Sequence, residues 1–503
     1  MSETAETDVA LVLEGTYPFV PGGVSSWVHQ ILHAYPDRKF SLIHIGPRKG
    51  FYERQVYDPP ENVVELQNLY CGGPGEAYSR KGKLRKRKGG SSSRVLEAIR
   101  RLHVEAEVDQ KLIEDLCAGD LSEEDFLHGD ASFELLRNEL YPKLGNGVAF
   151  TEFFWHYRAL HMPLLRLLNS EYAPSRIYHT VSAGYAGLVG VAASVRTGRP
   201  FFMTEHGIYA REREIELARA SWICDARPGG RCAPRPSPLR KFWSHFFKML
   251  SKIAYTQATR VVTLSETNRQ RQLKDGADPA KTYVVPNGVD KSQYAPSPDE
   301  AQDASNAERK RGMRIGFVGR VVPIKDVITL LRAFALARQQ ERMEMWIIGP
   351  IDEDKEYVHR CNVLATQLGL NKDVQFMGRQ PMRDIYPQLD VVVLTSISEG
   401  QPLVILEAYA NSVPIIATDV GACRELIEGA DEDDRRLGSA GVTTRVASPT
   451  DTAAAMVYLA KNPTLRVKMG QAGYQRIVTR YQQDDVISRY DRLYSSMGAA
   501  WQA

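Results

Sequence analysis

The stretch MRIGFVGRVVPIKDVITLLRAF, residues 313–334, contains the pattern that decides the fold. It begins with a short apolar run typical of a buried strand and passes through Gly319 into a polar loop. It then continues with apolar residues at helical spacing, and Asp326 stands where its side chain can cap the start of that helix. A strand that leads through a short loop into a helix is the repeating unit of α/β proteins with parallel sheets.

The same unit recurs through the second part of the chain. Four more apolar runs predict strands: MEMWIIGP (343–350), DVQFMGR (373–379), DVVVLTS (390–396) and VPIIATDVG (413–421). Helical stretches such as PLVILEAYANS follow them. Five strand-to-helix units predict a doubly wound, Rossmann-like domain over residues 313–480, followed by a closing helix at 481–503.

Residues 1–295 show the same alternation, which predicts a second Rossmann-like domain. A strand near the amino terminus is followed by VSSWVHQILHAY, whose apolar residues have helical spacing. Helical periodicity without strands predicts an insertion at about 72–147, and the polar segment 296–312 reads as the linker. We expect the strand ends of the two α/β domains to surround a cleft.

Composition limits the functional classes. The chain has 503 residues, 43% of them hydrophobic, and a formal net charge of +3, so nucleic acid is not the expected partner. No signal peptide or membrane span is recognisable, which predicts a cytoplasmic protein. The six cysteines have no C-x-x-C pair and are expected to be reduced: Cys71, Cys117, Cys224, Cys232, Cys361 and Cys423.

A basic run from Arg80 to Lys88 lies within the predicted insertion, flanked by glycine and serine. Such a run is typical of an exposed, solvated loop. Docking to anionic lipid or to a membrane partner is the alternative interpretation.

Two loops have the residues of an anion site. Gly319, Arg320 and Lys325 lie between a strand and a helix start, where two cations and free backbone amides suit a phosphate. Ordinary surface charges would explain these cations equally well. In the first domain, Gly22 and Gly23 open a helix after the first strand, which also suits close approach of an anion, although a simple tight turn explains them as well.

His206 follows the apolar strand PFFM, so its ring is expected at a strand end facing the cleft. An imidazole there can hydrogen-bond a sugar hydroxyl or phosphate and titrates near neutrality. A core or surface histidine is the ordinary alternative.

Glu399 and Glu407 have seven residues between them in SEGQPLVILEAYA, after a buried strand. Paired carboxylates are used in glycoside hydrolysis, where they flank the bond from opposite sides. Here both come from one loop-helix unit, and Pro402 can start the helix, so holding the hydroxyls of a ligand fits better. A dipole-favoured helix acid and a plain loop acid are the structural alternative.

The motifs GRVVPIK, SEGQPLVILEA and ATDVGACRELI follow one another in this order along the second α/β region, and together they resemble the retaining glycosyltransferases of family 4, which have the GT-B fold. LVLEGTYPFVPGGVSSWVHQI, TEHGIYARERE and the helical insertion are similar to the cytosolic members that act in Pel exopolysaccharide synthesis. The resemblance covers nearly the whole chain.

The resemblance implies roles for single residues. Arg320 and Lys325 match the cations on the donor diphosphate, Glu407 the acid on the ribose, and Glu399 the acid beside the donor sugar. His206 matches a histidine near the transferred sugar. The remaining matches contact the donor: Gly22, Gly23, Gly319, Phe376, Arg379, Gly400, Gln401, Pro402 and Leu403. Many members have glycine where this chain has Asp326, so this loop departs from the family pattern at that position.

The implied reaction is transfer of a hexose from UDP-glucose or a UDP-N-acetylhexosamine to a sugar acceptor, with retention of configuration. No metal or other cofactor is expected, because Arg320, Lys325 and helix N-termini supply positive charge. Inner-membrane polysaccharide synthase subunits are the expected protein partners, which would hold the chain at that membrane. Two other functions stay open: a UDP-sugar epimerase and a nucleotide-sugar-binding scaffold subunit.

Overall fold

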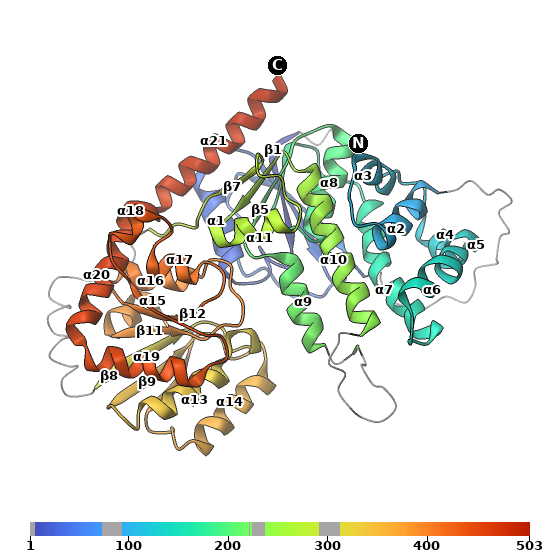
Figure 1. The fold of residues 1–503 in the computed structure, drawn as a ribbon. Coiled ribbons are helices and arrows are strands. Elements are labelled where there is room, and N and C mark those ends of the chain that lie inside the picture. Colours follow the sequence, from blue (N-terminus) through green and yellow to red (C-terminus); the bar gives the residue numbers. More distant parts are fainter. Residues whose placement is uncertain (1–5, 73–92, 221, 224–236, 291–311, 503) are drawn as a thin grey trace. The chain divides into compact units, whose positions relative to one another are not determined.

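The computed structural model describes residues 6–72, 93–220, 222–223, 237–290 and 312–502 (Figure 1). The basic run 80–88, Cys224, Cys232 and the predicted linker up to residue 311 lie outside the described residues. Contacts divide the chain into two compact units. The first unit is Met1–Thr263, Arg269–Tyr283 and Arg492–Ala503, and the second unit is Leu264–Asn268 and Val284–Asp491. Relative to the predicted domains, Val284 to Asp290 group with the second unit, and the end of the closing helix groups with the first.

The first unit contains a seven-stranded sheet in the order β3-β2-β1-β4-β5-β6-β7. The strand pairs from β3 through β6 are parallel. The strand β1 was predicted, whereas β2 and β3 were not. The strands are β1 (Thr7–Glu14), β2 (Phe40–Gly46), β3 (Val63–Tyr70), β4 (Ser175–Thr180), β5 (Phe201–Glu205), β6 (Arg260–Thr263) and β7 (Thr282–Val284).

Helices cover this sheet, and α8 packs against β1, β4 and β5. The predicted helix after the first strand is α1, which buries Trp27, Val28, Ile31 and Leu32. The helices are α1 (Gly23–Ala34), α2 (Arg94–Val104), α3 (Gln110–Leu116), α4 (Glu123–His128), α5 (Asp130–Glu134), η1 (Leu135–Leu140), α6 (Tyr141–Leu144), α7 (Phe150–Leu168), α8 (Tyr185–Thr197), α9 (Tyr209–Arg219), α10 (Pro238–Gln257) and α11 (Glu266–Lys274).

Helices α2 to α6 lie within the region that the sequence assigned to a helical insertion. Their apolar side chains join one core with α7 and α10. A buried histidine pair lies in this core, with 3.0 Å between the Nε2 atoms of His103 and His161. His161 Nδ1 lies 2.7 Å from the Tyr157 carbonyl, so it carries the proton, and His103 therefore donates from Nε2 to His161. Burial lowers the pKa of His161 to about 4, so the pair is neutral.

The second unit contains a six-stranded sheet in the order β10-β9-β8-β11-β12-β13, and all of its strand pairs are parallel. This is the 3-2-1-4-5-6 order of a doubly wound fold. The five predicted strands are present, and the sequence interpretation missed β13. The strands are β8 (Met313–Val318), β9 (Met343–Ile348), β10 (Val374–Gly378), β11 (Val391–Leu394), β12 (Ile415–Thr418) and β13 (Gly441–Thr444).

Two helix pairs pack against one another around this sheet, α13 with α19 and α16 with α20. At Gly473 on α20, an added Cβ would lie only 2.4 Å from the Tyr409 ring of α16, so the two helices approach closely. The helices are η3 (Pro323–Lys325), α13 (Val327–Ala337), α14 (Lys355–Gln367), α15 (Met382–Ile385), η4 (Tyr386–Gln388), α16 (Leu403–Ala410), α17 (Cys423–Glu428), α18 (Glu432–Arg435), α19 (Pro449–Lys461), α20 (Pro463–Arg480) and α21 (Gln483–Gln502), which extends into the first unit.

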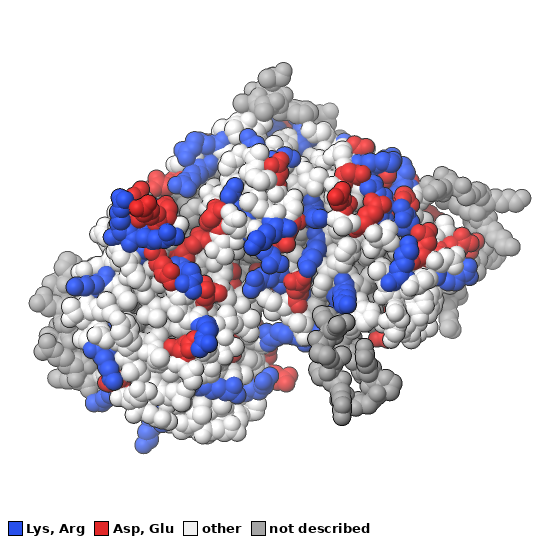
Figure 2. Space-filling view, in the orientation of Figure 1, with Lys and Arg blue, Asp and Glu red and all other residues white. Residues whose placement is uncertain are grey.

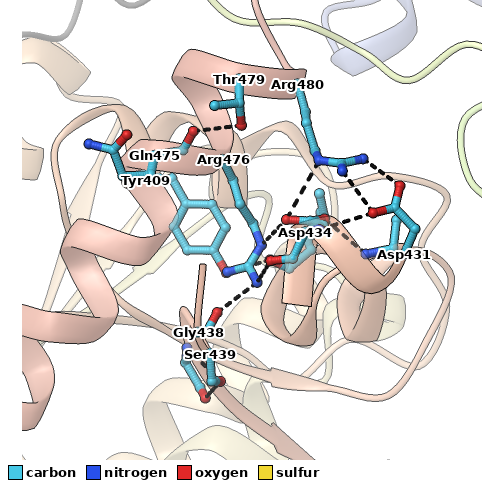
Figure 3. Close-up of polar contacts among 12 residues, drawn as sticks. Tyr409, Asp431, Asp434, Gly438, Ser439, Gln475, Arg476, Thr479 and Arg480 are labelled. Carbon is cyan, nitrogen blue, oxygen red and sulfur yellow. Dashed lines mark hydrogen bonds and ion pairs between the residues drawn. The ribbon is translucent and has the colours of Figure 1, made fainter. Parts of the chain in front are cut away.

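A buried ion pair joins α20 to α18, as Figure 3 shows. Arg476 Nε donates to Asp434 Oδ1 at 2.8 Å, and a second guanidinium nitrogen donates to the Gly438 carbonyl at 2.7 Å. The other carboxylate oxygen of Asp434 accepts from the Ala430 amide at 2.9 Å. Both side chains are 0% exposed, so these hydrogen bonds replace part of the hydration that both charges lose, and Nη1 of Arg476 has no hydrogen-bond partner among the described residues.

The described surface is mixed in charge. On the face that Figure 2 shows, acidic and basic side chains lie next to one another, in keeping with the small formal net charge of +3. Among the described helices, none combines the length and the apolar composition that a membrane span requires. The four described cysteines are free thiols: Cys71, Cys117, Cys361 and Cys423.

Candidate functional site

The topology of the second unit places two loops at the point where the strand order reverses. Strands β8 and β11 are neighbours in the sheet, although two strands separate them in the chain. In open α/β sheets, ligands bind outside the carboxyl ends of the strands at this reversal. The loop after β8 carries Arg320 and Lys325, and the loop after β11 carries Glu399.

The backbone after Lys325 has a conformation that glycine adopts easily. Asp326 has φ 47° and ψ 51°, the left-handed region, where Asp is one of the few tolerated side chains. Its carboxylate also accepts a hydrogen bond from the Thr329 amide at 3.2 Å, which confirms the predicted cap of α13. The helix cap offsets part of the conformational cost, so the loop keeps its turn without the glycine of the related motif.

Lys325 and Glu399 are brought into direct contact. Lys325 Nζ lies 2.5 Å from Glu399 Oε1, and their side chains are 20% and 11% exposed. The Ser396 hydroxyl also donates to Glu399 Oε1, at 2.5 Å. One oxygen of Glu399 therefore receives two donors, while the ammonium keeps contact with solvent and has donors left for a ligand.

Arg320 has a different partner. It donates to Glu353 at 2.9 Å, in an ion pair that is 45% and 33% exposed. Arg379 lies 3.8 Å from Asp352, in the same acidic segment after β9. Both arginines that were predicted to contact the donor are thus paired with this segment, and Phe376 lies on β10.

The loop from Glu399 to Leu403 packs tightly against Gly421 and Ala422, the two residues directly before α17. An added Cβ at Gly421, where φ is 53°, would lie 2.1 Å from the Glu399 carbonyl oxygen, so only glycine fits there. The Ala422 amide donates to the Gly400 carbonyl at 2.8 Å. Gln401 is buried and accepts from the Asn287 amide at 2.6 Å, and Pro402 is the N-cap of α16. These contacts fix the conformation of the loop.

Glu407 lies on the second turn of α16, the helix that was predicted to follow the loop of Glu399. Its Oε2 accepts from the Tyr386 hydroxyl at 2.6 Å. Desolvation raises the pKa of Glu407 above its ordinary value, and the Tyr386 hydrogen bond acts in the opposite direction. This carboxylate is held in a fixed orientation and is less strongly acidic than an exposed glutamate.

In the first unit, the loop after β1 leads into α1 through Gly22 and Gly23. Gly22 is the N-cap of α1, and the helix has no side-chain cap among the described residues. The Ser25 hydroxyl donates to the Val20 carbonyl at 2.6 Å, which closes the loop onto the helix. The free amides at this helix start are available to an anion, in agreement with the predicted local geometry.

His206 directly follows β5, at the predicted strand end, but it is buried. It is only 9% exposed, and its ring lies 4.7 Å from the Trp27 ring. Burial lowers the pKa of His206 to about 3, so the expected titration near neutrality is wrong. The imidazole is neutral at physiological pH, and its buried Nε2 has no hydrogen-bond partner among the described residues.

The turn that carries His206 is held by its neighbour. Glu205 accepts hydrogen bonds from Tyr255 and Gln272 at 2.7 Å and from the Tyr209 amide at 2.9 Å. Burial raises the pKa of Glu205, and these donors stabilise its charged form. They also fix the direction in which the chain leaves β5.

Several partners of the predicted residues were missed. Ser396 had one available signal, a hydroxyl directly after a buried strand, whereas Tyr386 and Glu353 had none. In the described part of the chain, no group of three or more His, Cys, Asp or Glu side chains is arranged to hold a metal ion. The metal-free mechanism stays a prediction.

Comparisons with known proteins give the family. Residues 7–280, more than half of the chain, match a domain of unknown function, DUF3492. Residues 298–476 match the glycosyl transferases group 1 family. The second match contains Lys325, Glu399 and Glu407, so the residues at the strand reversal lie within the matched region.

Individual relatives agree with this. The chain is 25% identical to an MMP alpha-(1->4)-mannosyltransferase of Mycolicibacterium hassiacum, over 65% of this chain and 72% of that protein. It is 33% identical to a D-inositol 3-phosphate glycosyltransferase of Kineococcus radiotolerans, over 44% of this chain and 53% of that protein. The chain spans about half the length of several such inositol phosphate enzymes, from 45% to 55%.

Solved structures share the fold. Anabaena HepE in complex with UDP has a TM-score of 0.59 at 15% identity, over 97% of this chain and 100% of that one. Sucrose-phosphate synthase from Thermosynechococcus elongatus has a TM-score of 0.60 at 16% identity, over 98% of this chain and 99% of that one. The chain therefore belongs to the DUF3492 family, its residues 298–476 match the glycosyl transferases group 1 model, and it has the GT-B fold.

Proposed function

We propose that this protein is a retaining glycosyltransferase that moves a hexose from a UDP-sugar to a sugar hydroxyl. The observation that carries the proposal is the contact between Lys325 and Glu399 at the strand reversal of the group 1 domain. A cation with free donors beside a carboxylate suits a ligand that carries both phosphate and hydroxyl groups. A nucleotide sugar has both.

In this proposal each charged residue has one task. Lys325 and Arg320 bind the diphosphate and stabilise the negative charge that grows on it as the bond to the sugar breaks. Arg320 must leave Glu353 to do so, and this exposed ion pair is weak enough to exchange. Glu399 accepts hydrogen bonds from hydroxyls of the sugar, and Glu407 from those of the ribose.

The remaining predicted residues have supporting tasks. Gly319, Gly400, Gln401, Pro402 and Leu403 shape the loops around the diphosphate and sugar, and Gln401 does so through its contact with Asn287. Phe376 and Arg379 lie by the nucleotide base. Gly22, Gly23 and His206 act from the first unit, where a neutral His206 can exchange hydrogen bonds with a sugar hydroxyl but supplies no charge.

Support for the donor comes from a protein of similar fold. Anabaena HepE has structures in complex with UDP, with UDP and glucose, and with UDP-glucose. UDP-glucose and UDP-N-acetylhexosamines are accordingly the donors proposed for this protein. The motifs near the amino terminus support a narrower assignment, PelF of Pel exopolysaccharide synthesis, acting in the cytoplasm beside inner-membrane synthase subunits.

The test is a transfer assay with the purified full chain. UDP-glucose, UDP-N-acetylglucosamine and UDP-N-acetylgalactosamine are each offered with a set of oligosaccharide acceptors. UDP release, product mass and the anomeric configuration by NMR are recorded. We expect a lengthened acceptor with retained configuration from one donor. Conversion of the donor to its epimer without transfer would identify an epimerase, and binding without any product would identify a scaffold subunit.

A further inference from the structure

Two hydroxyl residues at the end of β11 connect the loop of Lys325 to the loop of Glu399. The first is Thr395, which is 0% exposed. Its hydroxyl lies 3.0 Å from the carbonyl oxygens of both Lys325 and Asp326. One donor that bridges two successive carbonyls fixes the backbone path at the residue with the positive φ.

The second is Ser396, which is also fully buried. Its hydroxyl donates to Glu399 Oε1 at 2.5 Å, and its own carbonyl accepts from the Thr418 hydroxyl at 2.6 Å. The chain is thus anchored to β12 at Ser396 while the side chain orients the carboxylate. A backbone bond from the Ile397 amide to the Ile324 carbonyl, at 2.8 Å, joins the same two loops.

We propose that Thr395 and Ser396 are positioning residues that fix the Lys325 ammonium against the Glu399 carboxylate. The inference rests on the proposed function, because it assigns these hydroxyls a task in aligning diphosphate and sugar. Thr395 acts through the backbone of Lys325, and Ser396 acts through the carboxylate of Glu399. Neither hydroxyl needs to touch the substrate.

The chemistry of the two side chains supports this role. Both are buried, and both use their hydroxyl hydrogen for a bond within the loops. An apolar residue of the same shape would fill the same space, so packing alone does not require a hydroxyl at either position. Misplacement of a catalytic group by about 1 Å can cost about 10²-fold in rate, so small shifts of this loop matter.

The test compares Thr395→Val, which keeps the shape and removes the hydroxyl, with Thr395→Ser, which keeps the hydroxyl. We expect Thr395→Val to lower kcat about 10- to 100-fold relative to the wild type. Thr395→Ser keeps the hydroxyl, so its kcat should lie within about threefold of the wild-type value. Ser396→Ala should lower kcat in the same direction. Thr452→Val is the matched control, because Thr452 is equally buried and its hydroxyl bonds the Ser448 carbonyl at 3.0 Å in α19. Its kcat should match that of the wild type.

A double-mutant cycle separates positioning from a purely structural role. If Thr395 acts through Lys325, Thr395→Val should change the residual turnover of Lys325→Ala by less than about twofold. The inference would be overturned if Thr395→Val lowered kcat by the same factor in Lys325→Ala as in the wild type. It would also be overturned if the kcat of Thr395→Val alone equalled that of the wild type. Absence of transfer by the wild type with every donor would instead overturn the proposed function, so the two failures are distinguishable.

Discussion

Arg476 and Asp434 form one ion pair of the second unit, and Lys325 and Glu399 form another, with N–O distances of 2.8 and 2.5 Å. The first is 0% exposed on both sides, and further backbone groups bond to its guanidinium and carboxylate. The second lies in strand-end loops, and its cation is 20% exposed. Similar distances therefore occur in two different surroundings.

The difference indicates which pair can exchange partners. Separating Arg476 from Asp434 would leave the buried guanidinium without a carboxylate, and Asp434 would keep only Arg480, whose Nε lies 3.8 Å away, so the separation costs several kcal/mol. Lys325 can turn from Glu399 to a phosphate without losing all contact with solvent, and Glu399 keeps the Ser396 hydroxyl. We therefore infer that the buried pair supports the fold and the partly exposed pair serves a ligand.

The largest expected effect is on stability, at the buried pair. Arg476→Ala should lower the free energy of unfolding by about 3–5 kcal/mol, because Asp434 stays buried and keeps only the more distant Arg480, at 3.8 Å, as a cation. The measurement is denaturant unfolding, with the exposed Arg436→Ala as the control, which should change stability by less than about 1 kcal/mol. A loss equally small for Arg476→Ala would remove the distinction between the two pairs.

The next effect is on turnover, at the partly exposed pair. Lys325→Ala should lower kcat about 10²–10³-fold, because one cation no longer stabilises the departing diphosphate. Its unfolding free energy should fall by no more than about 1 kcal/mol. Transfer kinetics and denaturant unfolding on the same preparation check both values. Near-normal transfer by this variant would refute the charge-stabilising role.

Glu407 should give a smaller effect that depends on pH. Glu407→Gln should weaken UDP binding by about 1.5–3 kcal/mol, the range for a hydrogen bond to a charged group. The pKa of Glu407 is raised above the ordinary glutamate value, so the carboxyl group takes up a proton at a higher pH than an exposed glutamate does. The protonated group is a weaker hydrogen-bond acceptor for the ribose hydroxyls. UDP affinity of the wild type should therefore fall with decreasing pH, as calorimetry can measure. In Glu407→Gln this pH dependence should be lost, and its persistence would point to another group.

The smallest effect concerns the exposed pair of Arg320 with Glu353. Glu353→Gln should change the unfolding free energy by less than about 1 kcal/mol, because both side chains contact water. Since Arg320 is released from a competing carboxylate, UDP binding should become modestly tighter. Thermal unfolding and UDP titration check the two expectations. Weaker UDP binding would mean that Glu353 positions Arg320 for the ligand.

The sequence predicted much of the second unit because its strands are β-branched apolar runs with polar turns. It missed β13, whose four residues GVTT give little periodicity. In the first unit it missed β3, where VVELQNLY is only partly buried, and also β2, although FSLIHIG is buried throughout. Strand-end position indicated the loops of Lys325 and Glu399, and the family resemblance supplied the roles predicted for Lys325, Glu399 and Glu407. The hydrogen bonds of Tyr386 and Thr395 join residues that are distant in the chain, so a local sequence pattern could not predict them. The low pKa of His206 comes from burial in the folded chain, which the local sequence does not show either.

The central claim is that Lys325 exchanges its partner Glu399 for a phosphate of the ligand. Calorimetric titration of UDP into the wild type and into Lys325→Ala tests this claim most directly, because it measures binding without any later chemical step. We predict that UDP binds the wild type and that Lys325→Ala binds it at least tenfold more weakly, a loss of about 1.4 kcal/mol or more. Equal UDP affinity of the two proteins would contradict the claim that this pair serves the ligand.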